Sequence, residues 1–288
     1  MIIIEIIKAI ILGIIQGITE WLPISSTGHM ILFNTFWPMD PSQYSGGQDF
    51  INLFFVVIQF GSILAVLVLY FHRLNPFSSR KTKSEKKETI SLWTKVLVAV
   101  IPAGILGLLF ENVIDRYCYN AIVIAAMLIL YGIFFLILES RKHRPYICSF
   151  EQLGYQTALL IGLFQVLAFI PGTSRSGATI LGAILLGSSR YIAAEFSFFL
   201  AIPTMLGASL LKIAEYFVDY GIGFTKIELS VLLTGMVVAF IVSLFAIVFM
   251  MKFIQKHDFK PFGYYRIALG IFVLILFAGG VLTVTTSA

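Results

Sequence analysis

Long apolar stretches separated by short polar connections dominate the chain. Six of these stretches are long enough to cross a bilayer as helices, which requires about 20 apolar residues. They cover roughly 51–71, 93–110, 120–138, 191–211, 229–251 and 266–286. We therefore expect six transmembrane helices at these positions.

Two further apolar stretches are too short to span, and each follows a polar interruption. "STGHMILFNTFW" comes after "QGITEWLP", and "GATILGAILLG" comes after "PGTSRS". A helix of about eleven residues is about 16 Å long, which is half a bilayer. Each short stretch is therefore predicted to be the return limb of a re-entrant helix pair.

The charges of the connections predict the sidedness of the chain. Residues 72–95 contain seven Lys/Arg, residues 139–148 three and residues 252–266 four, which places these connections in the cytoplasm. The acidic or balanced connections 111–119 and 212–228 are expected outside, so Cys118 and Cys148 should lie on opposite faces. Asp40 and Asp49 follow the first re-entrant pair without a nearby cation, so that pair should enter from outside. The second pair, between Cys148 and Arg190, should enter from the cytoplasm.

The two re-entrant pairs resemble each other in sequence. The matches are Gly13, Gln16 and Leu32 with Gly162, Gln165 and Leu181 (offset 149), Pro23 and Ser26 with Pro171 and Ser174 (offset 148), and Phe54-Phe55 with Phe198-Phe199. Three spans, an odd number, follow each copy, so the copies have opposite orientations. Such broken helices meet near the membrane midplane and form the binding site there.

We therefore expect an all-α polytopic membrane protein with six transmembrane helices plus two re-entrant helix pairs, arranged as an inverted-topology repeat. Residues 1–288 would form a single membrane domain, with repeat A at about 1–140 and repeat B at about 150–288. Composition agrees, because 59% of the residues are hydrophobic and 12% are charged, against about 25% charged in soluble domains. The net charge of +5 comes mostly from the connections, which argues against nucleic-acid binding.

The stretch "PGTSRSGAT" (171–179) predicts an anion site. Pro171 ends a helix, and the Ser/Thr residues that follow can cap the next one. Pro23 and its serines repeat this arrangement, so two helix N-termini would face the membrane centre. Arg175 adds a planar guanidinium suited to phosphate. The alternative, a plain polar turn, does not explain an arginine whose burial costs about 2.5–3.5 kcal/mol.

The stretch "QGITEWLPISSTGH" (16–29) adds acid–base groups. Gln16 and Glu20 share one helix face with Gly13 and Gly17, which would permit close helix approach. Glu20 could handle a proton, bind a metal ion or form a structural pair with Arg175, and these roles are compatible. His29 is the one histidine within an intramembrane limb, where a structural role is the alternative. No HxxEH motif, cysteine cluster or GxxxxGK[ST] loop is present, which argues against a dedicated structural metal site and a nucleotide loop.

These motifs resemble those of the bacterial undecaprenyl-diphosphate phosphatase family. Its [E/Q]xxxE motif is similar to Gln16 to Glu20, its PxSSTGH motif to Pro23 to His29, and its PGxSRSG motif to Pro171 to Gly177. The resemblance implies removal of the terminal phosphate from the lipid carrier diphosphate for peptidoglycan synthesis, and bacitracin resistance on overproduction. It also implies a frequent dependence on Mg²⁺ or Ca²⁺; glutamine at position 16 removes one candidate metal ligand or base.

We accordingly expect a phosphatase for a polyprenyl diphosphate, with no organic cofactor. Arg175 would bind phosphate, Ser26 would attack or orient it, and Glu20 and His29 would handle protons, with Glu20 also a candidate metal ligand. The remaining candidate substrate-binding residues are Gln16, Ser25, Thr27, Thr173, Ser174, Ser176 and Thr179. The sequence leaves open whether a phospho-enzyme forms or water attacks directly, and whether the chain forms a homodimer.

A secondary transporter or lipid flippase is the rival interpretation, because inverted repeats with broken helices are transporter architecture. A purely structural membrane subunit would not explain the buried Arg, Glu and His residues. The resemblance implies a bacterial cytoplasmic membrane location, with the active site open to the outer side. The cationic loops are all cytoplasmic, but the positive-inside rule already accounts for them.

Overall fold

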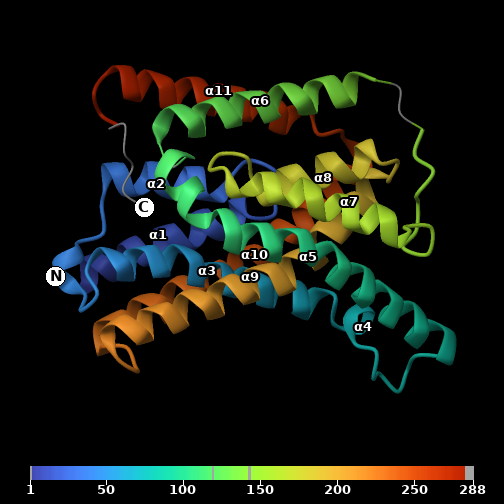
Figure 1. Cartoon of the computed structure of the whole chain (residues 1–288), viewed down its shortest axis with the longest axis horizontal. Helices are drawn as coiled ribbons and strands as arrows, with labels where there is room; N and C mark the ends of the chain where they lie inside the picture. Colours follow the sequence, from blue (N-terminus) through green and yellow to red (C-terminus); the bar gives the residue numbers. More distant parts are fainter. Residues whose placement is uncertain (1, 119, 142–143, 283–288) are drawn as a thin grey trace.

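The computed structural model describes residues 2–118, 120–141 and 144–282. Within these ranges the regular structure is helical, apart from one isolated bridge between Ile147 and Ser188. The elements are α1 (Ile2–Thr19), α2 (Ser26–Phe36), η1 (Pro41–Gln43), α3 (Gln48–Leu69), α4 (Phe71–Leu74), α5 (Lys83–Cys118), α6 (Ala121–Ser140), α7 (Tyr155–Val166), η2 (Leu167–Phe169), α8 (Arg175–Leu185), α9 (Arg190–Tyr220), α10 (Lys226–Lys256) and α11 (Lys260–Ala278). Figure 1 labels the α-helices among them.

Seven helices in the described ranges are long and apolar enough to cross a membrane, so the chain is a multi-pass integral membrane protein. Six of them coincide with the predicted spans: α3, α5, α6, α9, α10 and α11. The last predicted span extended to residue 286, and its residues 283–286 lie outside the described part. The seventh helix, α1, was expected to be the first limb of a re-entrant pair, and its 18 residues also satisfy the length criterion for a span.

Helix α11 begins earlier than the hydrophobic pattern predicted. Pro261 lies in its first turn, where the fixed φ of proline favours helix initiation. Arg266 is consequently a fully buried helical residue. The prediction that Arg266 belongs to a cytoplasmic cationic connection was wrong.

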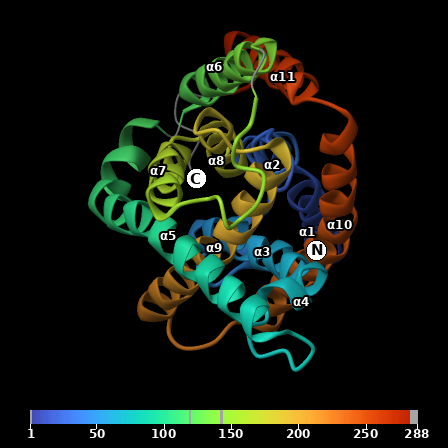
Figure 2. The same cartoon turned by 90° about the vertical axis from the view of Figure 1, so that its right-hand side faces the viewer.

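Two chain reversals lie inside the molecule, and the other connections lie at its ends. We call residues 20–25 the first turn, between α1 and α2, and residues 170–174 the second turn, between η2 and α8. Figure 1 shows both turns within the body of the molecule. The α9–α10 connection lies at the left-hand end, while α4 and the 144–154 segment lie at the right-hand end. In Figure 2, α2 and α8 lie near the centre, surrounded by longer helices.

Glycines permit the closest contacts between the short and the long helices. A Cβ atom added to Gly13 of α1 would lie 2.7 Å from the Gly235 carbonyl oxygen of α10. One added to Gly162 of α7 would lie 2.1 Å from the Ala99 carbonyl oxygen of α5. Backbone therefore packs directly on backbone in both places. The expected role of Gly13 in close helix approach is confirmed.

Candidate functional site

The first and second turns share an unusual backbone geometry. Ser25 and Ser174 have φ values of 75° and 70°, and no other non-glycine residue among those described has a positive φ. Each serine caps the following helix, because Ser25 Oγ accepts from the Gly28 amide at 3.3 Å and Ser174 Oγ accepts from the Gly177 amide at 3.2 Å. Strained backbone of this kind persists only where its surroundings enforce it, and it concentrates at functional sites.

The positions of the two capping serines also change the predicted sequence alignment of the two repeats at the turns. Ser25 corresponds structurally to Ser174, and Ser26 corresponds to Arg175, since each is the first residue of its helix. The predicted match of Ser26 with Ser174 was therefore wrong by one residue. As a result, a hydroxyl and a guanidinium occupy equivalent positions at the two helix N-termini.

Glu20 and Arg175 connect the two turns. Arg175 donates to Glu20 Oε1 from Nη2 at 3.0 Å and from Nε at 3.4 Å. The second carboxylate oxygen, Oε2, accepts from Ser26 Oγ at 2.8 Å and from Gln16 Nε2 at 3.1 Å. Glu20 is almost fully buried, so Arg175 supplies the counter-charge that a buried carboxylate requires. The structural Glu–Arg pair considered from the sequence is therefore present.

Helix α9 orients the guanidinium of Arg175 on the side away from Glu20. Arg175 Nη1 donates to the Ser197 carbonyl oxygen at 2.8 Å. The Ser197 and Thr179 hydroxyls lie 2.7 Å apart, and the Trp21 ring centroid lies 6.0 Å from Arg175 Cζ. Sequence reasoning missed Ser197, because it lies within the apolar α9 with no local motif around it. Thr179 thus joins α8 to α9.

Four of the candidate phosphate ligands are buried around the turns. Ser176 Oγ donates to the Glu20 carbonyl oxygen at 3.0 Å and lies 3.2 Å from Ser174 Oγ. The Thr173 hydroxyl is buried with no hydrogen-bond partner, and Gln16 is buried beside Glu20. Together with Thr179, these buried residues support the two turns from within the protein interior.

A cavity of about 510 Å³ opens between the turns and the long helices. The sequence-predicted residues that line it are Glu20, Ser25, Ser26, Thr27, Ser174 and Arg175. Its wall includes Gln59, Gln165 and Thr204, which were not predicted; Gln165 Nε2 donates to Thr204 Oγ1 at 3.3 Å. The only sequence signal among these three was the repeat match between Gln16 and Gln165.

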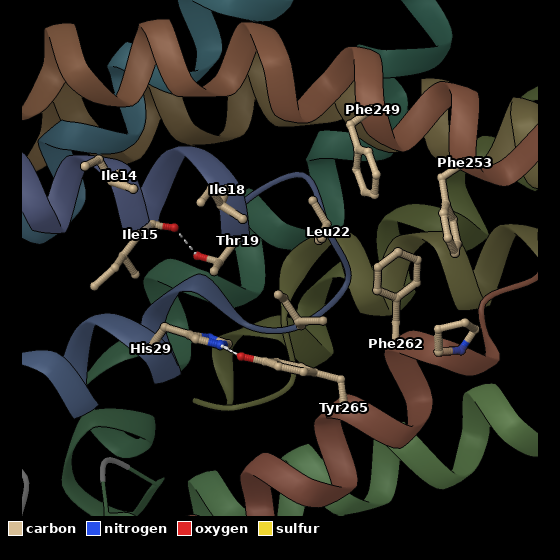
Figure 3. Close-up of a pocket in the computed structure, with 12 residues that line it drawn as sticks. Ile14, Ile15, Ile18, Thr19, Leu22, His29, Phe249, Phe253, Phe262 and Tyr265 are labelled. Atoms are coloured by element: carbon tan, nitrogen blue, oxygen red, sulfur yellow. Dashed lines mark hydrogen bonds between the residues drawn. The ribbon is translucent and has the colours of Figure 1, made fainter.

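His29 lies on the other side of the first turn. Its Nδ1 is 2.7 Å from the Ser25 carbonyl oxygen, and its Nε2 is 2.7 Å from the Tyr265 hydroxyl. Both bonds are satisfied when Nδ1–H donates to Ser25 and Nε2 accepts from Tyr265. Figure 3 shows this pair in a second, apolar pocket lined by Leu22, Phe249 and other residues. The structure therefore does not bring His29 together with Glu20 and Arg175 in the cavity.

Arg266 contacts both turns from α11. Its Nη1 donates to the Pro23 carbonyl oxygen at 3.0 Å, and its Nη2 donates to those of Gly172 at 2.7 Å and Thr173 at 2.9 Å. Sequence reasoning missed this residue, because it counted Arg266 among the cations of a loop.

The side chains available as ligands limit how a metal ion could bind at this site. Among the described residues, no three His, Cys, Asp or Glu side chains lie close enough together to hold one. Of the cavity lining described, Glu20 is the sole carboxylate, with the Ser26 hydroxyl beside it. Mg²⁺ commonly binds through one or two carboxylates plus substrate phosphates and water. The site therefore fits a divalent ion that is held largely by a bound diphosphate.

The arrangement suits transfer of a phosphoryl group. The Ser26 hydroxyl already donates to Glu20, which is the relationship of a nucleophile to its base. Arg175 and the N-termini of α2 and α8 place positive charge and N–H groups around the same space. An anion with two phosphates matches both features.

Comparison with known proteins gives consistent results over nearly the whole chain. A family model described as bacitracin resistance protein BacA matches residues 9–272. Undecaprenyl-diphosphatase 1 of Clostridioides difficile (strain 630) is 60% identical over 273 residues, covering 95% of this chain and 96% of that protein. The undecaprenyl-diphosphatase of Acetivibrio thermocellus is 58% identical over 275 residues, covering 95% and 98%. That of Enterococcus faecalis (strain ATCC 700802 / V583) is 54% identical over 269 residues, covering 93% and 95%.

Proposed function

The chain belongs to the bacitracin resistance protein BacA family, and on this premise we propose that it is an undecaprenyl-diphosphatase. It is an integral membrane phosphatase that hydrolyses undecaprenyl diphosphate to undecaprenyl phosphate and inorganic phosphate. This reaction recycles the lipid carrier for peptidoglycan synthesis and confers bacitracin resistance. The observation that carries the proposal is the bonded set of Ser26, Glu20 and Arg175 between two helix N-termini, in a chain 60%, 58% and 54% identical to three relatives of that name.

Arg175 and the two helix N-termini bind the diphosphate and stabilise the charge of the transferring phosphoryl group. In one route, Ser26 Oγ attacks the terminal phosphorus while its proton passes to Glu20, and the bond to the bridging oxygen breaks. Polyprenyl monophosphate leaves, and water then cleaves the phosphoserine. In the other route, Glu20 takes the proton from an attacking water, and Ser26 orients the phosphate. Both routes use the 2.8 Å contact between Ser26 and Glu20.

Glu20 would hold a divalent cation, Mg²⁺ or Ca²⁺, at this site. When bound, it would neutralise phosphate charge during transfer. Glu20 Oε2 is the protein oxygen placed for this role beside Ser26. The rest of the coordination would come from the diphosphate and water.

The active site opens to the outer face of a bacterial cytoplasmic membrane. Several residues of α5, from Val100 as far as Ile114, and several of α9, from Pro203 as far as Lys212, line the cavity. Both helices continue from there to the end of the molecule that carries the 220–226 connection (Figure 1). That end lacks the cationic loops, so the positive-inside rule makes it the outer side.

Helix packing supports two re-entrant pairs in an inverted-topology repeat within one membrane domain. Helix α1 packs on α10, and its counterpart α7 packs on α5, the counterpart of α10. The corresponding helices α3 and α9 pack on each other, and so do α6 and α11. A pseudo-two-fold axis in the membrane plane requires this exchange of partners. The repeats would cover about 1–140 and 150–288.

A phosphate-release assay tests the function directly. Purified protein in detergent, with no membrane gradient, is incubated with a polyprenyl diphosphate, with and without a chelator. We expect inorganic phosphate and polyprenyl monophosphate in equal amounts, and a lower rate with chelator if a divalent ion takes part. A transporter or flippase would release no phosphate in detergent, and that result would contradict the proposal.

A further inference from the structure

We propose that Arg266 is a positioning residue that holds the first and second turns in the register required for phosphoryl transfer. The inference rests on the proposed function, because it assumes that the reaction takes place between Glu20, Ser26 and Arg175. Arg266 would act through these residues, since it does not line the cavity.

The guanidinium of Arg266 links one turn to the other through backbone carbonyl oxygens. One nitrogen, Nη1, bonds to Pro23 of the first turn, and the other, Nη2, bonds to Gly172 and Thr173 of the second. These carbonyl groups lie in turns, where no regular helical hydrogen bonding serves them. A water-poor interior requires a donor for such groups. A planar fork with fixed donors also sets the distance between its acceptors.

The surroundings of Arg266 are consistent with a role in positioning the two turns. The residue is fully buried, and within the described chain no salt bridge joins it to a carboxylate. Its Cζ lies 5.5 Å from the Tyr131 ring centroid. A Cβ atom added to Gly177 would lie 3.3 Å from Arg266 Nη1, so the guanidinium packs against the start of α8. Its positive charge also lies close to the N-terminus of α8, which would bind the diphosphate.

The neighbouring residue makes a parallel contact. The Tyr265 hydroxyl bonds to His29, whose other ring nitrogen bonds to the Ser25 carbonyl oxygen. Adjacent residues of α11 therefore support the first turn at Pro23 and at Ser25. This gives His29 a positioning role: it holds the strained backbone of Ser25, which caps the helix that begins with Ser26.

The expected consequence is a loss of turnover. Ser26 Oγ and Glu20 belong to the first turn and its flanks, and Arg175 follows the second. A shift of one turn relative to the other would misplace the attacking group against the phosphate clamp. Misplacement by about 1 Å can cost about 10²-fold in rate.

The test compares variants of the full-length purified protein in detergent. Arg266→Lys keeps the charge and loses the fork, and Arg266→Gln loses both. Tyr265→Phe removes only the hydroxyl of a half-exposed side chain. Arg190→Gln is the matched control: Arg190 pairs with Glu139, whose Oε1 accepts from the Phe259 amide at 3.2 Å, so it supports the start of α11 without touching either turn. Each variant is measured for thermal unfolding, elution from size exclusion, kcat and KM.

For Arg266→Lys and Arg266→Gln we expect wild-type elution and a kcat at least about tenfold lower, with KM within about threefold of wild type. Tyr265→Phe should lower kcat less, and Arg190→Gln should keep wild-type kcat at a lower unfolding temperature. Wild-type kcat in a folded Arg266 variant would overturn the inference. An equal kcat loss in Arg190→Gln would do the same, because the loss would then reflect general destabilisation.

Two further outcomes are decisive. If neither Arg266 variant folds, Tyr265→Phe decides: a lowered kcat supports positioning by α11, and a wild-type kcat assigns Arg266 to stability alone. If the wild-type protein itself releases no phosphate, the proposed function fails. A failure of this inference is distinct, because it requires an active wild-type enzyme.

Discussion

Arg175 and Glu20 lie 155 residues apart in the chain, and their side chains form a salt bridge at 3.0 Å. The guanidinium is therefore paired before any phosphate arrives. A bound diphosphate must share Arg175 with Glu20 or displace it. The bond from Arg175 to the Ser197 carbonyl oxygen keeps the guanidinium in place on the α9 side. If phosphate replaces Glu20 as a partner, Arg175 therefore still points into the cavity.

Replacing Arg175 with lysine should preserve folding and remove most of the activity. Lysine retains the charge, but it cannot bond to phosphate, Glu20 and Ser197 with one planar group. We expect kcat/KM to fall by about 10²-fold or more, measured as phosphate release. Arg73→Lys is a suitable control, since Arg73 bonds to Glu195 at 2.7 Å away from the cavity. Near-normal turnover in Arg175→Lys would refute the phosphate clamp.

Replacing Glu20 with glutamine should lower both activity and stability. Removing one partner of a buried ion pair can cost about 3–5 kcal/mol, because the other charge stays buried. The double variant Glu20→Gln/Arg175→Gln should regain part of the lost unfolding temperature and none of the activity. Thermal unfolding and phosphate release, measured on Glu20→Gln, Arg175→Gln and the double variant, complete the cycle. If the single variant is as stable as the wild type, the pair contributes nothing to holding the repeats together.

Ser26→Ala separates the two chemical routes. If Ser26 attacks or orients the phosphate, kcat should fall as severely as in Glu20→Gln. Ser25 already caps α2, so loss of the Ser26 hydroxyl should change stability little. Full activity in Ser26→Ala would leave water as the nucleophile, activated by Glu20 alone.

The two cysteines report the sidedness of the membrane domain. Both are free, with Cys148 exposed and Cys118 partly exposed. An impermeant thiol reagent applied to intact cells, with any outer envelope permeabilised, should label Cys118 in preference to Cys148. Cys118→Ser and Cys148→Ser identify the labelled site. Labelling confined to Cys148 would reverse the proposed topology.

Sealed vesicles test the access side of the cavity. A short-chain, water-soluble prenyl diphosphate is added outside right-side-out vesicles, and phosphate is measured in the external medium. We expect hydrolysis, because the cavity extends along α5 and α9 toward the proposed outer end. Activity found only with inverted vesicles would place the opening in the cytoplasm.

The spans could be predicted because hydrophobic length alone identifies them. Each of the six predicted stretches overlaps a long helix, and two of these helices, α9 and α10, extend to 31 residues each. The start of α11 was misplaced because the pattern assigns a charged residue such as Arg266 to a connection. Only the folded chain supplies the backbone carbonyl oxygens that make burial of this arginine favourable.

The site was predictable where the groups lie close in sequence to a helix break. Glu20, Ser26 and Arg175 flank the two prolines, and all three line the cavity. His29 shares their motif, but its bond to the Ser25 carbonyl oxygen turns the ring to the other side of the first turn. Ser197 and Gln59 belong to long apolar helices, and only tertiary packing brings them to the turns and the cavity. No local pattern could have singled them out.

The packing of α1 on α10 has a consequence for biosynthesis. Ser243 of α10 donates to the carbonyl oxygen of Gly17, which lies 226 residues earlier. The first turn reaches the membrane when α10 and α11, which cover Gly17 and bond to Pro23, are still untranslated. The nascent chain must therefore carry Glu20 and its serines without their final partners through most of synthesis. This long-range closure comes late in synthesis, and it makes the C-terminal helices the elements that complete the surroundings of the two turns.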